Sequence, residues 1–140
     1  MEANALADAS RIKPPLNPDN AWWWDMADAG KLGIQRCSAC QTLRHPPRPM
    51  CGECRSLEWE AVEASGRGTI CSYTVLTYPQ FPGYQYPLII VLVDLEEGTR
   101  LTSQLVDCDP ADVDFDLPVQ MSIQQDPDGF KLPVFRLAGR

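Results

Sequence analysis

Two pairs of closely spaced cysteines constrain the fold of this chain more than any other feature of its sequence. Two residues separate Cys37 from Cys40 and Cys51 from Cys54, and ten residues separate the pairs. Two tight turns with this spacing can bring four thiolates around one ion in a tetrahedron. Disulfides or four free thiols are the alternatives, but cysteines this close rarely pair as structural disulfides, and the spacing repeats. The pattern therefore predicts a metal-binding ribbon.

Zinc is the expected metal of this ribbon. Thiolate-only tetrahedral sites also suit iron, and cysteine spacing alone does not separate the two metals. Because four protein ligands leave no open position for water or substrate, we expect the metal to be structural. A ribbon of about 25 residues cannot bury enough apolar surface to fold alone, so metal binding would supply stability that its small core lacks.

Charge is distributed unevenly along the chain, whose net charge is −7. The acidic balance argues against a nucleic-acid partner, since nucleic-acid-binding modules carry basic faces that neutralise phosphates. Near the cysteines, however, the sequence is basic, and a basic ribbon on an acidic body suits an anionic ligand or an acidic protein surface. The alternative is that these arginines are solvated surface residues. They are Arg36, Arg44, Arg48 and Arg55.

Length and apolar pattern indicate one or two small domains. The 140 residues are 44% apolar, and no segment approaches the roughly 20 apolar residues that span a membrane. The apolar run from Leu88 to Val93 is short and β-branched, which predicts a buried strand. The first residues lack the basic and apolar regions of a secretory signal. With reduced cysteines, this predicts a cytoplasmic protein with no membrane partner.

The order of the predicted elements indicates a mainly β protein in four segments. Residues 1–17 form a flexible arm or an extended strap, residues 18–32 an N-terminal helix, and residues 33–59 the ribbon. Residues 60–140 carry strand patterns at 68–77, 88–95, 99–106, 118–124 and 132–137, with one helical turn near 109–112. Five strands with a short helical insert fit a Greek-key barrel of the OB type, although a different five-stranded β fold is the alternative.

Three consecutive tryptophans, Trp22, Trp23 and Trp24, lie in the predicted helix. Successive helical residues are about 100° apart, so the three rings spread over roughly 200° of the helix surface. Because one small domain rarely covers so wide an arc, we expect at least one indole to contact another polypeptide, where tryptophan is favoured. In the alternative, two rings cap the core of the domain and the third lies flat on its surface.

The chain resembles the family of OB-fold proteins with a rubredoxin-like zinc ribbon, long described as a domain of unknown function. The resemblance covers about residues 21–137. Besides the Trp-rich helix, its motifs are Gln35-Arg36-Cys37-Ser38-Ala39-Cys40, the segment 43–49 before Cys51, Gly66-Arg67-Gly68-Thr69-Ile70, and the segments 106–113 and 132–135. Gln41 stands where the family usually has glycine, and Gly52 where proline is common; neither change removes a metal ligand.

The resemblance implies a non-catalytic accessory subunit of a thiolase-superfamily enzyme that acts on acyl-CoA thioesters in a hetero-oligomer. The implied partner is a lipid-transfer-protein-type thiolase or aldolase, and some relatives serve a retro-aldol cleavage in bacterial steroid side-chain degradation. The helix and ribbon would dock on the enzyme, and the arginines would contact CoA phosphates or the partner. A condensing acyltransferase complex and a stand-alone acyl-CoA-binding module are the alternatives.

The segment 78–87, which would join the first two barrel strands, carries three prolines and the rings of Phe81, Tyr84 and Tyr86. OB folds often bind ligands at this connection. The rings could form a lip that contacts the partner or an acyl chain, because stiff aromatic segments make contacts at small entropic cost. In the alternative, they fold back onto the barrel.

A set of catalytic residues is not evident in the sequence. His45 is the single histidine, so any triad would have to use it, and its place between prolines favours packing against the ribbon. Cys71 lies in a strand pattern and is expected to fill core volume. Asp107 and Asp109 flank Cys108, and neighbouring negative charge raises the pKa of a thiol. We therefore expect no catalysis by the chain itself.

Overall fold

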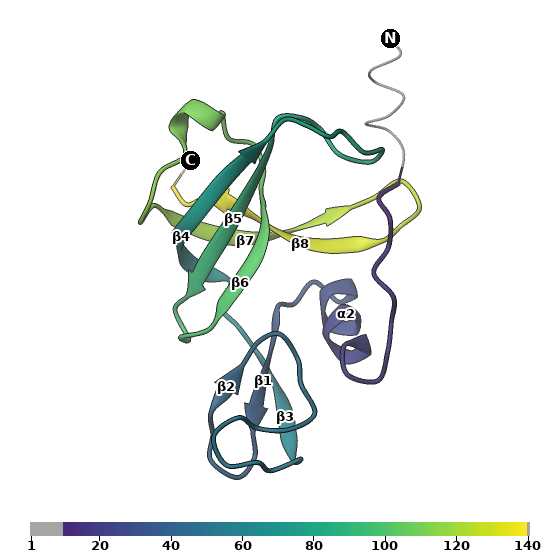
Figure 1. Cartoon of the computed structure of the whole chain (residues 1–140), viewed down its shortest axis with the longest axis vertical. Helices are drawn as coiled ribbons and strands as arrows, with labels where there is room; N and C mark the ends of the chain where they lie inside the picture. The colour runs from purple at the N-terminus through teal and green to yellow at the C-terminus, as the bar shows by residue number, and fades with distance from the viewer. Residues whose placement is uncertain (1–9, 140) are drawn as a thin grey trace.

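A three-stranded sheet at one end of the molecule and a closed five-stranded barrel at the other are linked by a short connection, with one helix beside them (Figure 1). The computed structural model describes residues 10–139. The first part of the predicted arm, residues 1–9, lies outside the described residues. The mainly β class, the N-terminal helix and the five-stranded barrel of the prediction are confirmed.

The helix α2, Ala21–Asp28, follows a turn in which the carbonyl oxygen of Asn17 accepts the N–H groups of Asn20 and Ala21 at 3.2 and 2.9 Å. It ends at Asp28, before the predicted residue 32, and Gly30, two residues later, has a φ of +84°, which glycine readily adopts at the end of a helix. Trp23 and Ala27, four residues apart, form its buried face.

The ribbon sheet consists of β1 (Gly33–Cys37), β2 (Leu43–Arg44) and β3 (Trp59–Glu63). All pairs are antiparallel, and β1 lies in the centre, so the order is β2-β1-β3. Because β3 pairs with β1 along its whole length, the ribbon sheet continues to Glu63, beyond the residue 59 at which the sequence pattern placed its end.

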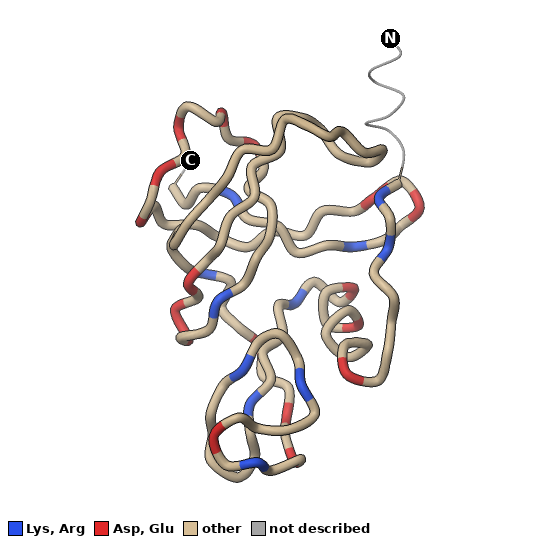
Figure 2. Tube along the Cα trace, in the orientation of Figure 1, with Lys and Arg blue, Asp and Glu red and all other residues tan. Residues whose placement is uncertain are grey.

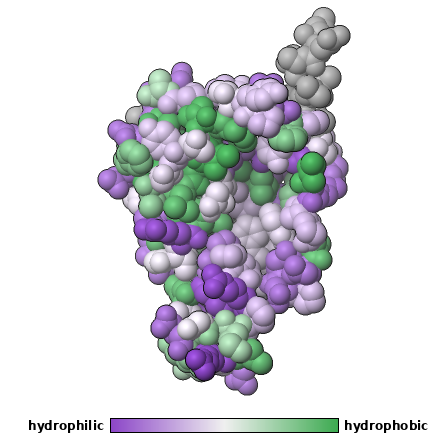
Figure 3. Space-filling view, in the orientation of Figure 1, coloured by the Kyte–Doolittle hydropathy of each residue, from purple (hydrophilic) through white to green (hydrophobic). Residues whose placement is uncertain are grey.

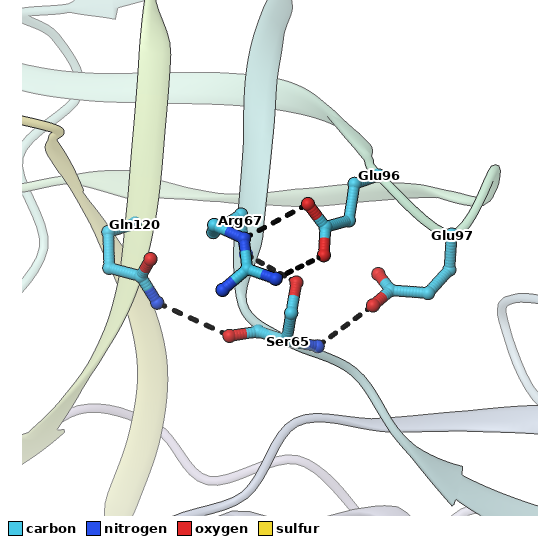
Figure 4. A network of polar contacts seen from close by, with 5 residues as sticks. All are labelled: Ser65, Arg67, Glu96, Glu97 and Gln120. Carbon is cyan, nitrogen blue, oxygen red and sulfur yellow. Dashed lines mark hydrogen bonds and ion pairs between the residues drawn. The ribbon is translucent and has the colours of Figure 1, made fainter.

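Polar contacts hold the connection between β3 and the barrel (Figure 4). The backbone N–H of Ser65 donates to the Glu97 carboxylate at 2.9 Å, and the Gln120 side chain donates to the Ser65 carbonyl at 3.4 Å. Arg67, two residues after Ser65, forms an ion pair with Glu96 and binds both of its carboxylate oxygens at 3.0 and 2.6 Å. Hydrogen bonding and the charge of Arg67 lower the pKa of Glu96. The connection is thus fixed to a turn and to a strand of the barrel.

The barrel contains β4 (Arg67–Leu76), β5 (Leu88–Leu95), β6 (Arg100–Leu105), β7 (Pro118–Gln125) and β8 (Lys131–Leu137). The 3₁₀ turn η1, Pro110–Asp112, joins β6 to β7 at the predicted place. The strand order is β4-β5-β6-β8-β7, closed by β7 against β4, with β6 and β8 parallel and the other pairs antiparallel. This is the OB-type topology expected from the sequence.

One hydrophobic core extends from the barrel to the base of the ribbon. Inward-facing side chains such as Ile70, Val91 and Phe135 are fully buried. Trp23 of α2 and Ile34 of β1 belong to the same cluster, so the helix and ribbon share the core of the barrel. Within residues 10–139, no helix combines the length and apolar character that crossing a membrane requires.

Residues 10–17 run as an extended strap beside the barrel, from the tip of the β7–β8 hairpin to α2 (Figure 1). Arg11 fixes the strap and is only 8% exposed. Its backbone N–H donates to the Asp126 carboxylate at 3.1 Å, and its guanidinium donates to the Gly83 carbonyl at 3.3 Å and to the Gln104 side chain. The sequence left a flexible arm and an extended strap as alternatives for this segment, and residues 10–17 form the extended strap.

Candidate metal centre and adjacent groove

The two cysteine pairs occupy turns with the same hydrogen bonding. In the first turn, the N–H of Cys37 donates to the Thr42 carbonyl at 2.9 Å, and in the second, the N–H of Cys51 donates to the Ser56 carbonyl at 2.9 Å. Each hydrogen bond thus closes a turn of six residues, which directs both of its sulfur atoms to the same side. The first cysteine of each pair is buried and the second is exposed.

The four sulfur atoms lie in an arrangement that fits a tetrahedral metal. All four are within 4.8 Å of one another, with Cys37 and Cys54 at 3.5 Å and Cys40 and Cys51 at 3.6 Å. A tetrahedron with zinc–sulfur bonds of about 2.3 Å has sulfur atoms about 3.8 Å apart. The predicted ligand residues are therefore placed to hold one metal ion. With four thiolates bound, a tetrahedral ion would have no open coordination position for water or substrate.

Backbone N–H groups favour the thiolate form that a metal requires. Those of Cys40 and Ala39 lower the pKa of Cys37 to about 6, although burial opposes them. Those of Cys54 and Glu53 lower the pKa of Cys51. For Cys54, the N–H of Ser56 acts in the same direction, but hydrogen bonding among the neighbouring sulfur atoms prevails and raises the pKa to about 12. Four negative sulfurs so close together repel one another, and a dication at the centre would remove that repulsion.

A buried amide holds the proline-containing loop between the two cysteine turns. The side chain of Gln35 on β1 donates to the Arg48 carbonyl and accepts from the Arg48 N–H, both at 2.9 Å. Gln35 is 2% exposed. Sequence reasoning did not assign it this role, although a glutamine within a strand whose neighbours are buried was a signal that its amide is paired internally.

The predicted basic residues surround the ribbon but differ in their surroundings (Figure 2). Arg36 forms an ion pair with Glu60 at 2.6 Å, so the Glu60 carboxylate compensates the charge of the guanidinium. Arg44 and Arg48 line a hollow of about 370 Å³ between the ribbon and the β5–β6 hairpin, together with Arg100. Arg55 is exposed. The structure therefore brings together two of the four predicted arginines, while the acidic segment 107–116 lies at the far side of the barrel (Figure 2).

The three tryptophans pack in different directions. Trp23 is buried, and its indole N–H donates to the Gly33 carbonyl at 3.0 Å. Trp22 and Trp24 are half-buried and pack against different aromatic rings. The ring centroids of Trp22 and Trp59 are 5.0 Å apart, and those of Trp24 and Phe130 are 5.3 Å apart. Contact of either half-buried indole with another polypeptide stays a prediction.

A groove of about 680 Å³ lies between the barrel, α2 and the strap. In the space-filling view the surface is hollowed there, and hydrophobic side chains gather on the neighbouring face of the barrel (Figure 3). The predicted aromatic lip contributes Phe81, Tyr84 and Tyr86 to this groove, and α2 contributes Trp23 and Trp24. Five of the six aromatic residues that were predicted to contact a partner thus line one groove, while Trp22 packs against Trp59 outside it.

The other residues that sequence analysis considered for chemistry are spread over the molecule. His45 packs beside Trp23, with ring centroids 5.8 Å apart, and burial lowers its pKa. Cys71 is half-buried on β4, at the irregularity in its pairing with β5. The thiol of Cys108 donates to the Asp109 carbonyl at 3.3 Å. These three residues belong to different segments, and none of them is among the four clustered cysteines.

Two family models match the chain, and together they span the ribbon and most of the barrel. Residues 24–60 match the rubredoxin-like zinc ribbon domain of ChsH2, and residues 61–124 match the C-terminal OB-fold domain of ChsH2. The zinc ribbon that the cysteine spacing predicted is therefore confirmed as a domain type, and the four cysteines are positioned to bind its metal.

Two curated relatives extend the similarity. A probable enoyl-CoA hydratase alpha subunit of Thermomonospora curvata is 45% identical over 131 residues, which are 93% of this chain and 41% of the relative. The 3-oxo-4,17-pregnadiene-20-carboxyl-CoA hydratase alpha subunit of Mycobacterium tuberculosis is 40% identical over 117 residues, which are 84% of this chain and 37% of the relative. The chain spans about two fifths of the length of these two relatives.

A solved structure, described as the Ltp2-ChsH2(DUF35) aldolase, contains a chain of very similar fold. The two superpose with a TM-score of 0.86 at 45% identity, covering 90% of this chain and 99% of that chain. Fold and sequence thus agree over nearly the whole length of that chain. The resemblance seen in the motifs is therefore confirmed, and the chain belongs to the ChsH2 (DUF35) family, in which a rubredoxin-like zinc ribbon is followed by an OB-fold domain.

Proposed function

We propose that this chain is a non-catalytic accessory subunit of a hetero-oligomeric enzyme that acts on acyl-CoA thioesters. Its catalytic partner is a thiolase-superfamily protein of the lipid-transfer type. The observation that carries this proposal is the similarity to the ChsH2 chain of the Ltp2-ChsH2(DUF35) aldolase, which this chain matches over 99% of that chain. At 45% identity over nearly all of that chain, the similarity supports an equivalent assembly.

The geometry of the candidate sites supports an accessory role. A metal held by four cysteines has no coordination position for a substrate, so the centre would stabilise the ribbon and perform no step of the reaction. Zinc in this role, with iron as the alternative, is part of the proposal. His45, the only histidine of the sequence, packs against the ring of Trp23. The chain would thus position a partner or its substrate, and the partner would supply the reacting groups.

The more specific reaction that we propose is retro-aldol cleavage of the side chain of a steroid CoA ester. The relative in Mycobacterium tuberculosis, named for a pregnadiene carboxyl-CoA, supports a steroid thioester as the substrate class, and the name of the solved complex supports an aldolase. A condensing acyltransferase complex and a stand-alone acyl-CoA-binding module are the competing functions.

Reconstitution tests this function. The chain and a lipid-transfer-type aldolase from the same genome are purified separately and together, and each sample receives a β-hydroxyacyl-CoA ester of a steroid. We expect a stable complex in size-exclusion chromatography with light scattering, and release of the ketone and the shortened acyl-CoA only by the complex. Cleavage by this chain alone, or equal cleavage by the aldolase without it, would overturn the proposal.

A further inference from the structure

The groove beside α2 exists because β5 is apolar on both of its faces. Along the sequence Leu-Ile-Ile-Val-Leu-Val, alternate residues Ile89, Val91 and Val93 are buried in the barrel core. The intervening residues Leu88 and Ile90 face outward and line the groove. The outer face of a barrel strand usually carries polar residues, because only the inner face is covered by the core. Leu88 is covered by this chain itself, whereas Ile90 is half-buried and keeps surface that an apolar ligand could cover.

The groove contains no charge that is free to bind an ionic ligand. Arg11 is the only lysine, arginine, aspartate or glutamate among the described residues that line it. Its guanidinium donates to Gly83 and Gln104 and lies 4.5 Å above the centroid of the Tyr84 ring. His45 also lines the groove, and burial disfavours its charged form. A ligand that enters this space must therefore place an uncharged part there.

The size and walls of the groove suit a rigid hydrocarbon. Its volume of about 680 Å³ lies within the range of roughly 300–1,000 Å³ for small-molecule sites. Flat rings form part of the wall, from Trp24 on α2 and from Tyr84 and Tyr86 on the 77–87 loop, while Leu76 and Ile90 form an aliphatic floor. Flat aromatic faces opposite branched aliphatic side chains make close contact with a flat, fused-ring molecule, and a flexible chain would lose more conformational entropy there.

We propose that this groove binds the uncharged fused-ring part of the CoA thioester, while the charged CoA portion stays outside it. The proposal rests on the proposed function and names where the acyl group of the substrate is held. It concerns the free chain, so it does not require that the partner be present. The strap and the 77–87 loop form the wall on one side, and the outer faces of β4, β5 and β6 form the floor.

Equilibrium dialysis of the metal-loaded full chain against radiolabelled progesterone, a neutral 3-oxo steroid without CoA, tests this assignment. Parallel measurements use 1-dodecanol, a neutral linear probe, and free CoA. We expect saturable binding of progesterone at one site per chain, at least tenfold weaker binding of dodecanol, and no competition by CoA. Absence of saturable progesterone binding, preference for dodecanol, or competition by CoA would each overturn the proposal.

Two variants locate the bound steroid. Thr102→Trp adds a large ring from an exposed groove-lining position on β6, and Ile90→Glu adds a charge to the groove floor. Each should weaken progesterone binding at least tenfold. Thr69→Trp is the matched control, because Thr69 is exposed on β4 and lies outside the groove-lining residues. Circular dichroism and metal content verify folding, and unchanged binding by a folded Thr102→Trp or Ile90→Glu protein would overturn the assignment.

The two proposals fail in distinguishable ways. A chain that binds progesterone in the groove but never assembles with an aldolase would retain the groove assignment and overturn the accessory function. A chain that activates the aldolase but binds no steroid by itself would retain the function and overturn the groove assignment. If Thr102→Trp instead blocks assembly in a chain that binds no steroid, the groove is a protein interface and the assignment is wrong.

Discussion

Gln41 and Arg55 occupy the same position in the two halves of the metal site, each directly after the second cysteine of its pair. Both have a positive φ, 66° for Gln41 and 65° for Arg55. The N–H of Gln41 donates to the Cys37 carbonyl at 2.9 Å, and that of Arg55 donates to the Cys51 carbonyl at 3.0 Å. The tight turn that directs two sulfurs at one ion therefore requires a residue with left-handed backbone conformation at its end.

Glycine at either position should stabilise the protein. A non-glycine residue in the left-handed region costs roughly 1 kcal/mol, and glycine does not carry that cost. We expect Gln41→Gly and Arg55→Gly each to raise the free energy of unfolding of the metal-loaded protein by about 0.5–1 kcal/mol, measured by urea denaturation. Ser38→Gly, in the same turn but without a positive φ, is the control and should lower it slightly. Destabilisation by both glycine variants would contradict this account.

Replacement of one cysteine ligand by serine should greatly reduce metal binding, although the other three cysteine ligands remain in the chain. Cys40→Ser leaves three thiolates, and we expect the metal content per chain, measured by elemental analysis, to fall well below one ion. We expect the metal of the parent protein to be zinc, so its absorption spectrum should lack thiolate-to-iron bands. Cys71→Ser, on β4 and outside the sulfur cluster, should retain the full metal content. A Cys40→Ser protein with one ion per chain would show that the cluster is not the binding site.

Gln35 should contribute to stability through its two hydrogen bonds to Arg48. Replacement by leucine keeps the volume but leaves the Arg48 N–H without its side-chain partner, while the Arg44 guanidinium still donates to the Arg48 carbonyl. We expect Gln35→Leu to lower the free energy of unfolding by about 1–2 kcal/mol, measured by urea denaturation. Gln125→Leu, at the exposed end of β7, should change it by less than about 0.5 kcal/mol. Equal effects of the two variants would contradict the role of the buried amide.

Local sequence patterns predicted the parts of this fold that local interactions determine. The cysteine spacing predicted the ribbon because two residues between ligands match one tight turn, and the apolar pattern of β5 predicted a buried strand. Gln41 was noted as a departure from glycine, and its φ of 66° explains why glycine is usual there. The strap was left open as one of two alternatives, because Arg11 is fixed by Asp126 and Gly83, which are 115 and 72 residues away in the sequence.

The groove was beyond reach of sequence reasoning for a related reason. Its walls come from the strap, α2, the 77–87 loop and four barrel strands, and no periodicity within one segment records how the segments meet. The aromatic rings of Phe81, Tyr84 and Tyr86 were recognised individually, but their convergence with Trp24 depends on the closure of the barrel. The apolar outer face of β5 was the available signal, since its continuous apolar run exceeds what one buried face requires.

Acidification should destabilise the protein through His45. Burial lowers the pKa of this imidazole below its usual value of 6.5, so the folded state binds fewer protons than the unfolded state between the two values. Its stabilising contribution is therefore complete above about pH 6.5 and is lost as the pH falls toward the lowered pKa, by at most about 1.4 kcal/mol per pH unit. In urea denaturation from pH 7.5 to 5.5, His45→Gln should lose less stability than the parent.

Metal content must be followed in the same titration, because acid also protonates the cysteine ligands. The comparison between the parent and His45→Gln is made only at pH values at which both proteins keep their metal. Equal slopes of unfolding free energy against pH for the two proteins would show that His45 titrates alike in the folded and unfolded states.

The three tryptophans should separate into one core residue and two interface candidates. Trp23 is 8% exposed, so Trp23→Ala should lower the free energy of unfolding by about 3–5 kcal/mol. Trp22 and Trp24 are half-buried and retain surface for a partner. We expect Trp22→Ala or Trp24→Ala to weaken binding to the proposed aldolase at least tenfold, or about 1.4 kcal/mol, as measured by calorimetry, with unchanged metal content. If neither variant weakens the complex, the indoles serve only the internal packing of this chain, and the partner must dock elsewhere.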